Sequence, residues 1–227
     1  MFEVFSFRHI LPFFKGAALT LQICVVTAIL GMILGTLMGL AYASKNRFLS
    51  TLAKGYVNIL RGIPLLVGLF FTYFTIPLIF KGTQVSREVA CGFSLTIYAG
   101  AYISELVRGS ILSIPKGQTE AASAMGMTYI QRMMYVIFPQ AVRLLIPPLV
   151  GLLITLVKDS SLVSVLNYVD LTRTGKIVGN LTMNPLLSYT IVAIFYFVIC
   201  FSLSRLAHFS EVKLQKNSKS KREVKAL

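Results

Sequence analysis

Residues 16–44 read GAALTLQICVVTAILGMILGTLMGLAYAS, a run of 29 residues without a charged side chain. A helix needs about 20 apolar residues to cross the roughly 30 Å of hydrocarbon in a bilayer, so this run is long enough to span a membrane. It is also too long for the apolar core of a signal peptide, and we expect it to remain in the mature protein. The sequence therefore predicts an integral membrane protein.

Four further stretches between charged residues repeat this pattern. They cover 19, 16, 14 and 28 residues, and the 14-residue stretch before Lys158 is too short to span alone. Their apolar residues are continuous, whereas those of a spanning barrel alternate. We predict an all-α membrane protein with five spanning helices, near residues 17–43, 57–80, 87–109, 133–157 and 186–208.

The composition excludes other classes of protein. The 227 residues are 56% hydrophobic and only 13% charged, about half the charged share of a soluble domain. This apolar content excludes disorder, and three cysteines are too few for a disulfide scaffold. Cys24, Cys91 and Cys200 lie in separate apolar runs, and His9 and His208 are far apart, so no metal site is predicted.

The basic residues predict the orientation in the membrane. Lys and Arg number 22 against 8 acidic residues, and an excess of basic residues marks the cytoplasmic side. We expect twelve on one side and six on the other, so the amino terminus lies outside and the carboxyl terminus in the cytoplasm. The larger set is Lys45, Arg47, Lys54, Arg108, Lys116, Arg132, Lys213, Lys216, Lys219, Lys221, Arg222 and Lys225; the smaller set is Arg8, Lys15, Lys81, Arg87, Arg173 and Lys176.

Two local patterns in the first two spans indicate structure. Gly31, Gly35 and Gly39 are four residues apart and share one helical face, which favours close helix packing over a ligand role. Pro64 is tolerated in the first turn of a helix, where no N–H is needed, so it predicts a helix start. The preceding Arg61 can meet lipid phosphate or a neighbouring loop.

The stretch 114–148 is longer than a connection between two spans requires. Residues 118–125 favour a short helix, and Gly126 suits the left-handed position that ends one. Small alanines would let a partner protein close around this helix. On the residues alone, an ordinary interfacial connection is as good an interpretation as a functional loop.

Several motifs in this order resemble the polar amino acid branch of the ABC importer permeases. EAASAMG at 120–126, followed by FPQA at 138–141, is similar to their EAA loop, with Met125 in place of the usual Leu. LRGIPLL (60–66), AYISELVRG (101–109), PKGQTE (115–120) and KDSSLVSV (158–165) match that branch as well. The resemblance covers about residues 15–208. We expect one transmembrane domain, 1–227, with this core and a basic cytoplasmic tail, 209–227, that lies beside anionic lipid rather than nucleic acid.

The resemblance implies a multi-pass permease in a prokaryotic cell membrane. Two permeases, identical or paralogous, would form a dimer. Two ATPase subunits would dock on the coupling loop at Glu120, Ala121, Ala122 and Gly126, and an extracytoplasmic binding protein would deliver the substrate. The chain has no GxxxxGK[ST] loop, so ATP and Mg belong to the partner, no cofactor is expected here, and the chain is not predicted to be an enzyme.

The fourth span suggests where the substrate binds. Lys158 and Asp159 follow Arg143 by only about 21 Å of helix, so we expect both at membrane depth, where charged residues usually face a cavity. Lys158 would bind a substrate carboxylate and Asp159 an ammonium group, while Ser160 and Ser161 satisfy a locally opened backbone. Plausible apolar walls are Leu65, Leu152 and Val163. On the residues alone, a Lys–Asp pair that ends the helix at the outer interface fits equally well.

The cargo and the remaining charges are also predicted. Gly151-Leu152 stands where many relatives carry Asn-Glu, so a cationic substrate is disfavoured and an uncharged or sulfur-containing amino acid is expected. Glu105 and Arg108 are spaced for an ion pair, and with Arg61 and Arg143 they are assigned structural or gating roles. The alternatives are a permease-like membrane sensor or scaffold, and an importer of another small metabolite.

Overall fold

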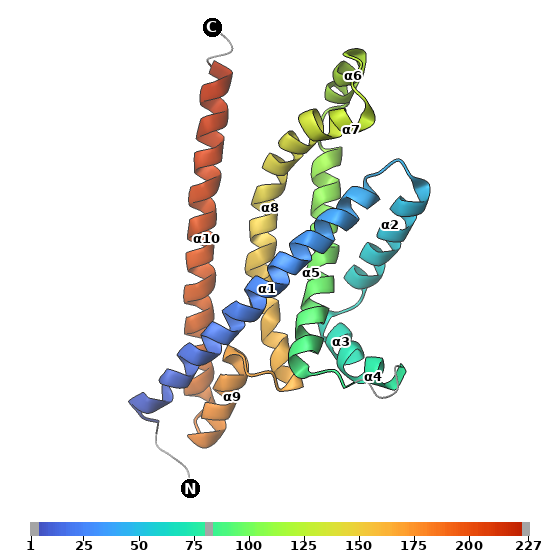
Figure 1. Ribbon diagram of the computed structural model, residues 1–227. Helices are drawn as coiled ribbons and strands as arrows, with labels where there is room; N and C mark the ends of the chain where they lie inside the picture. Colours follow the sequence, from blue (N-terminus) through green and yellow to red (C-terminus); the bar gives the residue numbers. More distant parts are fainter. Residues whose placement is uncertain (1–4, 80–83, 224–227) are drawn as a thin grey trace.

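The structure of the protein, a computed structural model, describes residues 5–79 and 84–223, with side chains as far as residue 206. Throughout these ranges the ordered elements are helices, without a strand (Figure 1). Four helical stretches of the described residues are long and apolar enough to cross a membrane, and the number is five if a bent pair of helices is counted as one span. The predicted all-α membrane architecture is confirmed.

The centre of the bundle is the contact between α1 (Leu11–Tyr42) and α5 (Arg87–Leu112). A Cβ atom on Gly35 would lie 2.6 Å from Cβ of Ile103 and 2.7 Å from the carbonyl oxygen of Gly100. A Cβ atom on Gly39, one helical turn further along, would overlap Val107 in the same way. The glycine stripe therefore serves helix packing, as the sequence indicates.

The second span differs from its prediction. A continuous helix over 57–80 is wrong: α2 (Arg47–Gly62) ends at the proline, and Leu65–Ile79 continues at 104° to it. Pro64 does start a helix, as the N-cap of the next one, and Ile63 before it is extended, because a residue before proline avoids the helical region. The second part contains α3 (Leu65–Phe70), a π-helical turn (Phe71–Thr75) and α4 (Ile76–Ile79), and Lys81 lies outside the described residues.

The fourth span is composite and carries the loop that precedes it. The loop holds α6 (Lys116–Ala124) and α7 (Tyr129–Arg132). A π-helical turn (Met133–Ile137) leads into α8 (Phe138–Asp159), and a 3-10 helix (Ser160–Leu166) extends it. The predicted short helix exists, begins two residues earlier than expected, and is followed by Gly126 at φ +77°.

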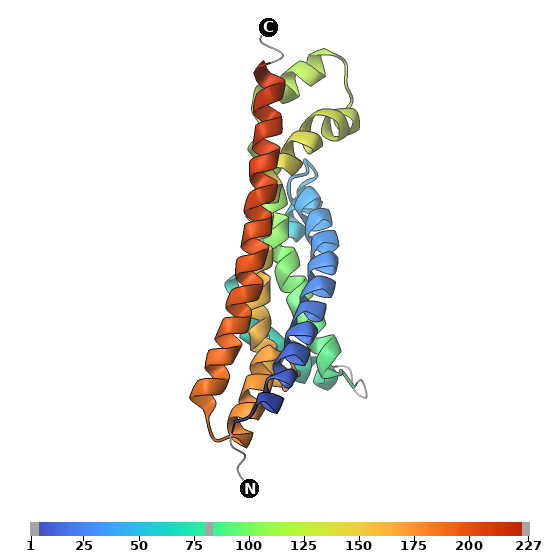
Figure 2. The same ribbon diagram turned by 90° about the vertical axis from the view of Figure 1, so that its left-hand side faces the viewer.

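The last part of the chain adds a helix that the sequence analysis does not predict. Helix α9 (Leu171–Leu181) packs on the start of α1 and on α10 (Pro185–Glu223). Figure 2 shows α10 running the length of the bundle, with α9 near one end and the α6–α7 loop near the other. Of the expected tail, the backbone of 209–223 continues α10, and 224–227 lie outside the described residues.

Candidate functional site

A row of polar side chains joins the end of α2 to one face of α5. Nε of Arg108 donates a hydrogen bond of 3.3 Å to the Glu105 carboxylate, and the two side chains also form an ion pair through Nη2. Nη1 of Arg61 lies 3.9 Å from the same carboxylate, and its guanidinium lies 5.2 Å from the centre of the Tyr102 ring. Tyr102 in turn contacts the hydroxyl of Tyr98 at 3.2 Å. We call Arg61, Tyr98, Tyr102, Glu105 and Arg108 the polar seam.

The polar seam explains two charges that the sequence left open. Glu105 and Arg108 pair as their spacing predicts. Arg61 does not depend on lipid for a partner, because Glu105 and Tyr102 of the same chain surround it. A guanidinium held both by a carboxylate and by an aromatic ring is well fixed, so the seam fastens the broken second span to α5.

Lys158 and Asp159 lie in the last turn of α8. The 3-10 helix prolongs this helical stretch to Leu166, beyond both charges. The Lys158 side chain is exposed, while Asp159 is half-buried and interacts electrostatically with Tyr98 of the polar seam. The backbone after Asp159 is not opened: it tightens into the 3-10 helix, and the Ser160 hydroxyl donates to the Val157 carbonyl at 2.8 Å.

The expected apolar walls divide into two groups. Leu65 and Val163 are buried, with 6% and 0% of their surface exposed, and both belong to the main apolar cluster between α1, α3, α5 and α8. In this chain they fill the core and do not line an open cavity. Leu152 is partly exposed on α8, and Ser161 is partly exposed just beyond its end.

Tyr98 is the site residue that the sequence analysis missed. Tyr98, Tyr102 and Glu105 follow one another at spacings of four and three, which places them on one face of a helix. That spacing was visible in the sequence. The electrostatic interaction of Tyr98 with Asp159 was not, because the two residues lie on different helices whose relative rotation only the fold defines.

The predicted coupling loop presents helix α6 at the surface. Glu120 and Ala121 are exposed, but Ala122 is only 1% exposed and packs against its own chain. Ala122 therefore supports the loop from within and is not part of the free surface. Nothing lies within 4 Å of a Cβ placed on Gly126, so its glycine is required by the positive φ rather than by space.

Apolar side chains gather on the surface beside α6. Met125, Ile130, Met134 and Tyr135 are all at least 60% exposed. An open groove of about 400 Å³ is lined by Met125, Gly126, Met127, Gln131 and Tyr135. Exposed apolar patches with a polar rim are typical of protein–protein contacts, and methionine adapts its shape to a partner. The loop thus has the surface of a docking site.

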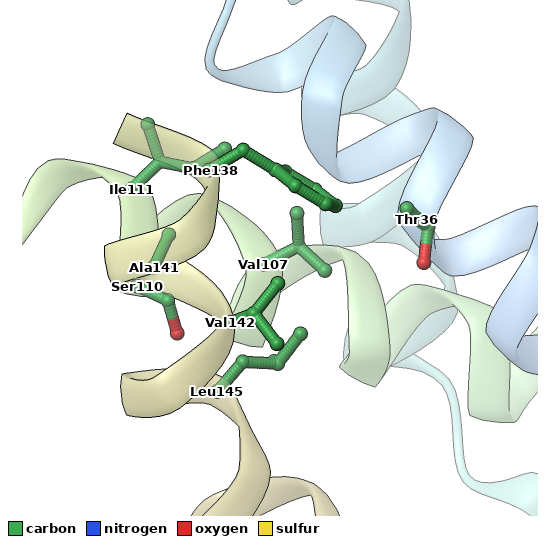
Figure 3. Close-up of a pocket in the computed structure, with 8 residues that line it drawn as sticks. All are labelled: Thr36, Val107, Ser110, Ile111, Phe138, Ala141, Val142 and Leu145. Atoms are coloured by element: carbon green, nitrogen blue, oxygen red, sulfur yellow. The ribbon is translucent and has the colours of Figure 1, made fainter. Parts of the chain in front are cut away.

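The junction of α8 with α1 and α5 contains a small cavity. Figure 3 shows side chains of Thr36, Val107, Phe138, Val142 and Leu145 arranged around it. The cavity measures about 60 Å³, and Ser110, Ile111 and Ala141 complete its lining. Its lining is largely apolar. Because this space is left between the helices, α8 packs less tightly here than α1 packs on α5.

The opposite end of the bundle is held by a buried carboxylate. Asp170 precedes α9, accepts hydrogen bonds from the backbone N–H groups of Arg173 (2.8 Å) and Thr172 (3.1 Å), and lies 3.4 Å from the Tyr196 hydroxyl. Burial raises the pKa of Asp170 above its usual value of 3.8, although the two backbone donors act in the opposite direction. This cap fixes the start of α9 and joins it to α10.

Comparisons with known proteins agree with this architecture. The chain is 39% identical over 202 residues to the L-cystine transport system permease protein TcyB of Bacillus subtilis (strain 168), which covers 88% of this chain and 86% of the relative. It is 36% identical over 216 residues to a putative glutamine transport system permease protein, GlnP, of Rickettsia felis (strain ATCC VR-1525 / URRWXCal2), covering 94% of this chain and 99% of the relative.

Among solved structures, the chain is similar to a crystal structure of an amino acid ABC transporter with histidines. The TM-score is 0.86 and the sequences are 31% identical, over 93% of this chain and 100% of that one. The family described as binding-protein-dependent transport system inner membrane components matches residues 29–216. The chain belongs to this family of transport permeases.

Proposed function

We propose that this chain is the membrane-spanning permease subunit of an ATP-driven importer for a small polar amino acid. The observation that carries the proposal is the connection of two regions by one span: Asp159 interacts electrostatically with Tyr98 of the polar seam near one end of the span, and the exposed loop of α6 precedes the other end. A substrate site within the membrane and a docking site outside it are what an ATP-driven permease needs.

In this proposal the substrate is bound as a zwitterion. Lys158 binds its carboxylate and Asp159 its ammonium group, with Ser160, Ser161 and the exposed surface of Leu152 nearby. Two opposite charges of the protein at membrane depth favour a substrate that carries both signs. Each substrate charge then takes the place of the water that Lys158 or Asp159 has lost.

The proposed cargo is an uncharged or sulfur-containing amino acid. One observation supports this choice: Gly151-Leu152 provides no carboxylate for a cationic side chain. Arginine, lysine and histidine are therefore expected to compete poorly.

The proposed assembly contains two permeases, two ATPase subunits that hold ATP and Mg, and an extracytoplasmic binding protein. The α6 loop, through Glu120, Ala121 and Gly126, lies in the cytoplasm against the ATPase, and α9 lies outside. ATP binding draws the ATPase subunits together, and α6 follows, so the permease alternates between inward and outward states.

The test is amino-acid-stimulated ATPase activity of this chain reconstituted in lipid with its co-expressed ATPase and binding protein. Cystine, methionine, glutamine, arginine, lysine and histidine would be offered in turn. We expect stimulation by an uncharged or sulfur-containing amino acid. The stimulation should disappear in Glu120→Lys, which reverses the charge on the docking helix, and in Gly126→Pro, which cannot adopt φ +77°.

The substrate residues are tested with charge-neutral variants in the same complex. Lys158→Met and Asp159→Asn should each raise the KM for uptake by about ten-fold or more, since a charged hydrogen bond is lost. Thr190→Ala is a control, because the Thr190 hydroxyl bonds only to a carbonyl of its own helix. Unchanged uptake in both charge variants would refute the site, and a complex that responds to no amino acid would favour another metabolite or a sensor.

A further inference from the structure

Movement of α6 can reach Lys158 and Asp159 through the beginning of α8, and this beginning is irregular. The N–H of Phe138 donates to the carbonyl of Met133, five residues back, in the π-helical turn. Pro139 has no N–H, so the carbonyl of Tyr135 lacks the donor that a regular helix would provide. The pattern of backbone hydrogen bonds is therefore interrupted between the loop and the span, and we call this interruption the weak place.

One side chain bridges this weak place. Nε2 of Gln140 donates a hydrogen bond of 2.7 Å to the carbonyl of Val136, inside the π-helical turn. The same amide group donates to Oε1 of Gln118, in α6, at 3.3 Å. A glutamine amide has two hydrogens, so both bonds can exist together. Gln140 thus connects α6, the π-helical turn and the first turn of α8.

Two other contacts hold the parts on either side. Arg132 donates to the Ser123 hydroxyl, which joins α7 to α6. Ile114, Ile137 and Ala141 form an apolar cluster at the inner side of the π-helical turn. Neither contact is a hydrogen bond between α6 and α8, and apolar side chains can slide past one another. The hydrogen bonds of Gln140 join α6 to α8 in a defined geometry.

The far side of the same helical turn faces the cavity. Phe138, Ala141 and Val142, which flank Gln140 in sequence, line this space of about 60 Å³ against α1 and α5 (Figure 3). The first turn of α8 is therefore bonded on the side of α6 and loosely packed on the side of the bundle. A displacement of α6 would move this turn with it into free space.

We propose that Gln140 is a positioning residue that makes α6 and the beginning of α8 move as one body. The inference rests on the proposed function, in that an ATPase moves α6. Gln140 touches neither substrate nor ATP; it determines how much of the movement of α6 reaches the span with Asp159. Loss of its bonds would leave ATP hydrolysis running while transport falls.

The functional test compares ATP hydrolysed per amino acid transported in proteoliposomes of the full complex. Gln140→Leu removes both donated bonds and keeps the size of the side chain; Gln118→Leu removes one acceptor, and Gln118→Glu keeps it. We expect the ratio to rise about three- to ten-fold in Gln140→Leu, the factor for one or two ordinary hydrogen bonds. It should rise less in Gln118→Leu and stay near the wild-type ratio in Gln118→Glu and in the control Gln22→Leu, on the exposed face of α1.

A second measurement needs no cargo. Spin labels at Thr119→Cys in α6 and Leu144→Cys in α8 would report their distance in the complex in lipid. A single narrow distribution is expected with Gln140 and a clearly broader one with Gln140→Leu. An unchanged distribution and an unchanged ratio would overturn the inference, as would equal losses of transport and ATPase activity together with loss of the assembled complex. A wild-type complex without amino-acid stimulation would refute the proposed function alone, because the distances still test Gln140.

Discussion

The contact of α1 with α5 and the junction of α6 with α8 are built in opposite ways. On α1, glycines bring two backbones together so closely that a single added carbon would overlap its neighbours at Gly35 and Gly39. At the junction the backbone is interrupted by a π-helical turn and Pro139, and the adjoining packing leaves a cavity of about 60 Å³. One region has no room for movement, and the other has both room and a weak place.

This difference suggests a division of labour. Close-packed protein interiors transmit displacement without deforming, so α1 and α5, with α9 fixed at one end and α2 fixed through the polar seam, form a rigid frame. Short π-helical turns are frequent at functional sites. The part from α6 to the beginning of α8 is then an arm that moves against the frame. Each of the following predictions tests one side of this comparison.

The largest effect is expected from a side chain inside the frame. Gly35→Val would place carbon atoms within overlap distance of Ile103 and of the Gly100 carbonyl, and α1 would have to separate from α5. Such overpacking typically costs about 1–3 kcal/mol, and more where backbone is the obstacle. The measurement is thermal unfolding of the purified protein in detergent. Gly55→Ala, with nothing within 4 Å of the added carbon, should be neutral or stabilising; equal midpoints for both variants would contradict the rigid frame.

The next effect concerns the end of the frame where α9 is fixed. Asp170→Ala removes the acceptor for the Arg173 and Thr172 amides and should destabilise the protein by about 1–2 kcal/mol, as loss of a helix cap does. Asp170→Asn keeps a hydrogen-bond acceptor and should lose less stability than Asp170→Ala. Similar stability of the Ala and Asn variants in chemical unfolding would show that the cap does not hold α9.

The same carboxyl has a predicted pH dependence. Because burial raises its pKa, the folded protein holds the proton more tightly than the unfolded chain does. The free energy of unfolding due to Asp170 therefore falls as pH rises from about the usual value of 3.8 through the raised folded pKa. Asp170→Asn should abolish this slope, and an identical slope in the variant would assign the dependence to another group.

The frame was easier to predict from the sequence than the arm. Charge-free runs and the spacing of Gly31, Gly35 and Gly39 are local properties, and they gave the long helices and their closest contact. The bend after Gly62 was missed, although Pro64 was recognised as a helix start, because the direction of a chain after a break depends on what it packs against. The burial of Leu65 and Val163, named as plausible apolar walls, could not be predicted for the same reason, since the inward face of a helix is defined by its neighbours.

Short elements were missed where tertiary contacts create them. Helix α9 has too few residues to be stable alone, and it buries Leu171, Gly175 and Val178 against α1 and α10. The bonds of Gln140 were equally invisible, because the partner Gln118 is 22 positions away and the π-helical turn leaves no mark in the spacing of apolar residues.

A moderate effect is expected in the polar seam. Glu105→Gln removes the charge that holds Arg61 and Arg108, and since both pairs are partly exposed, the loss of stability should stay near about 1 kcal/mol. The expected functional effect is larger, because α2 and the bent second span would lose their tie to α5. Uptake should fall several-fold while unfolding changes little. Leu106→Ile, a neighbouring apolar exchange, is the control. Wild-type uptake in Glu105→Gln would show that the polar seam does not contribute to the rigid frame.

The smallest change in stability should come from filling the cavity beside the arm. Val142→Ile adds one methylene to a side chain that lines the space of about 60 Å³, and a buried methylene contributes about 0.8 kcal/mol at most where it fits without strain. The unfolding midpoint should therefore rise slightly. Transport should nevertheless slow, because the first turn of α8 loses the space into which it moves. The same exchange at Val25, on the exposed face of α1, should alter neither quantity. A Val142→Ile variant that is more stable and transports at the wild-type rate would show that the loose packing at the junction is not used for movement, and the distinction between frame and arm would then rest on the bonds of Gln140 alone.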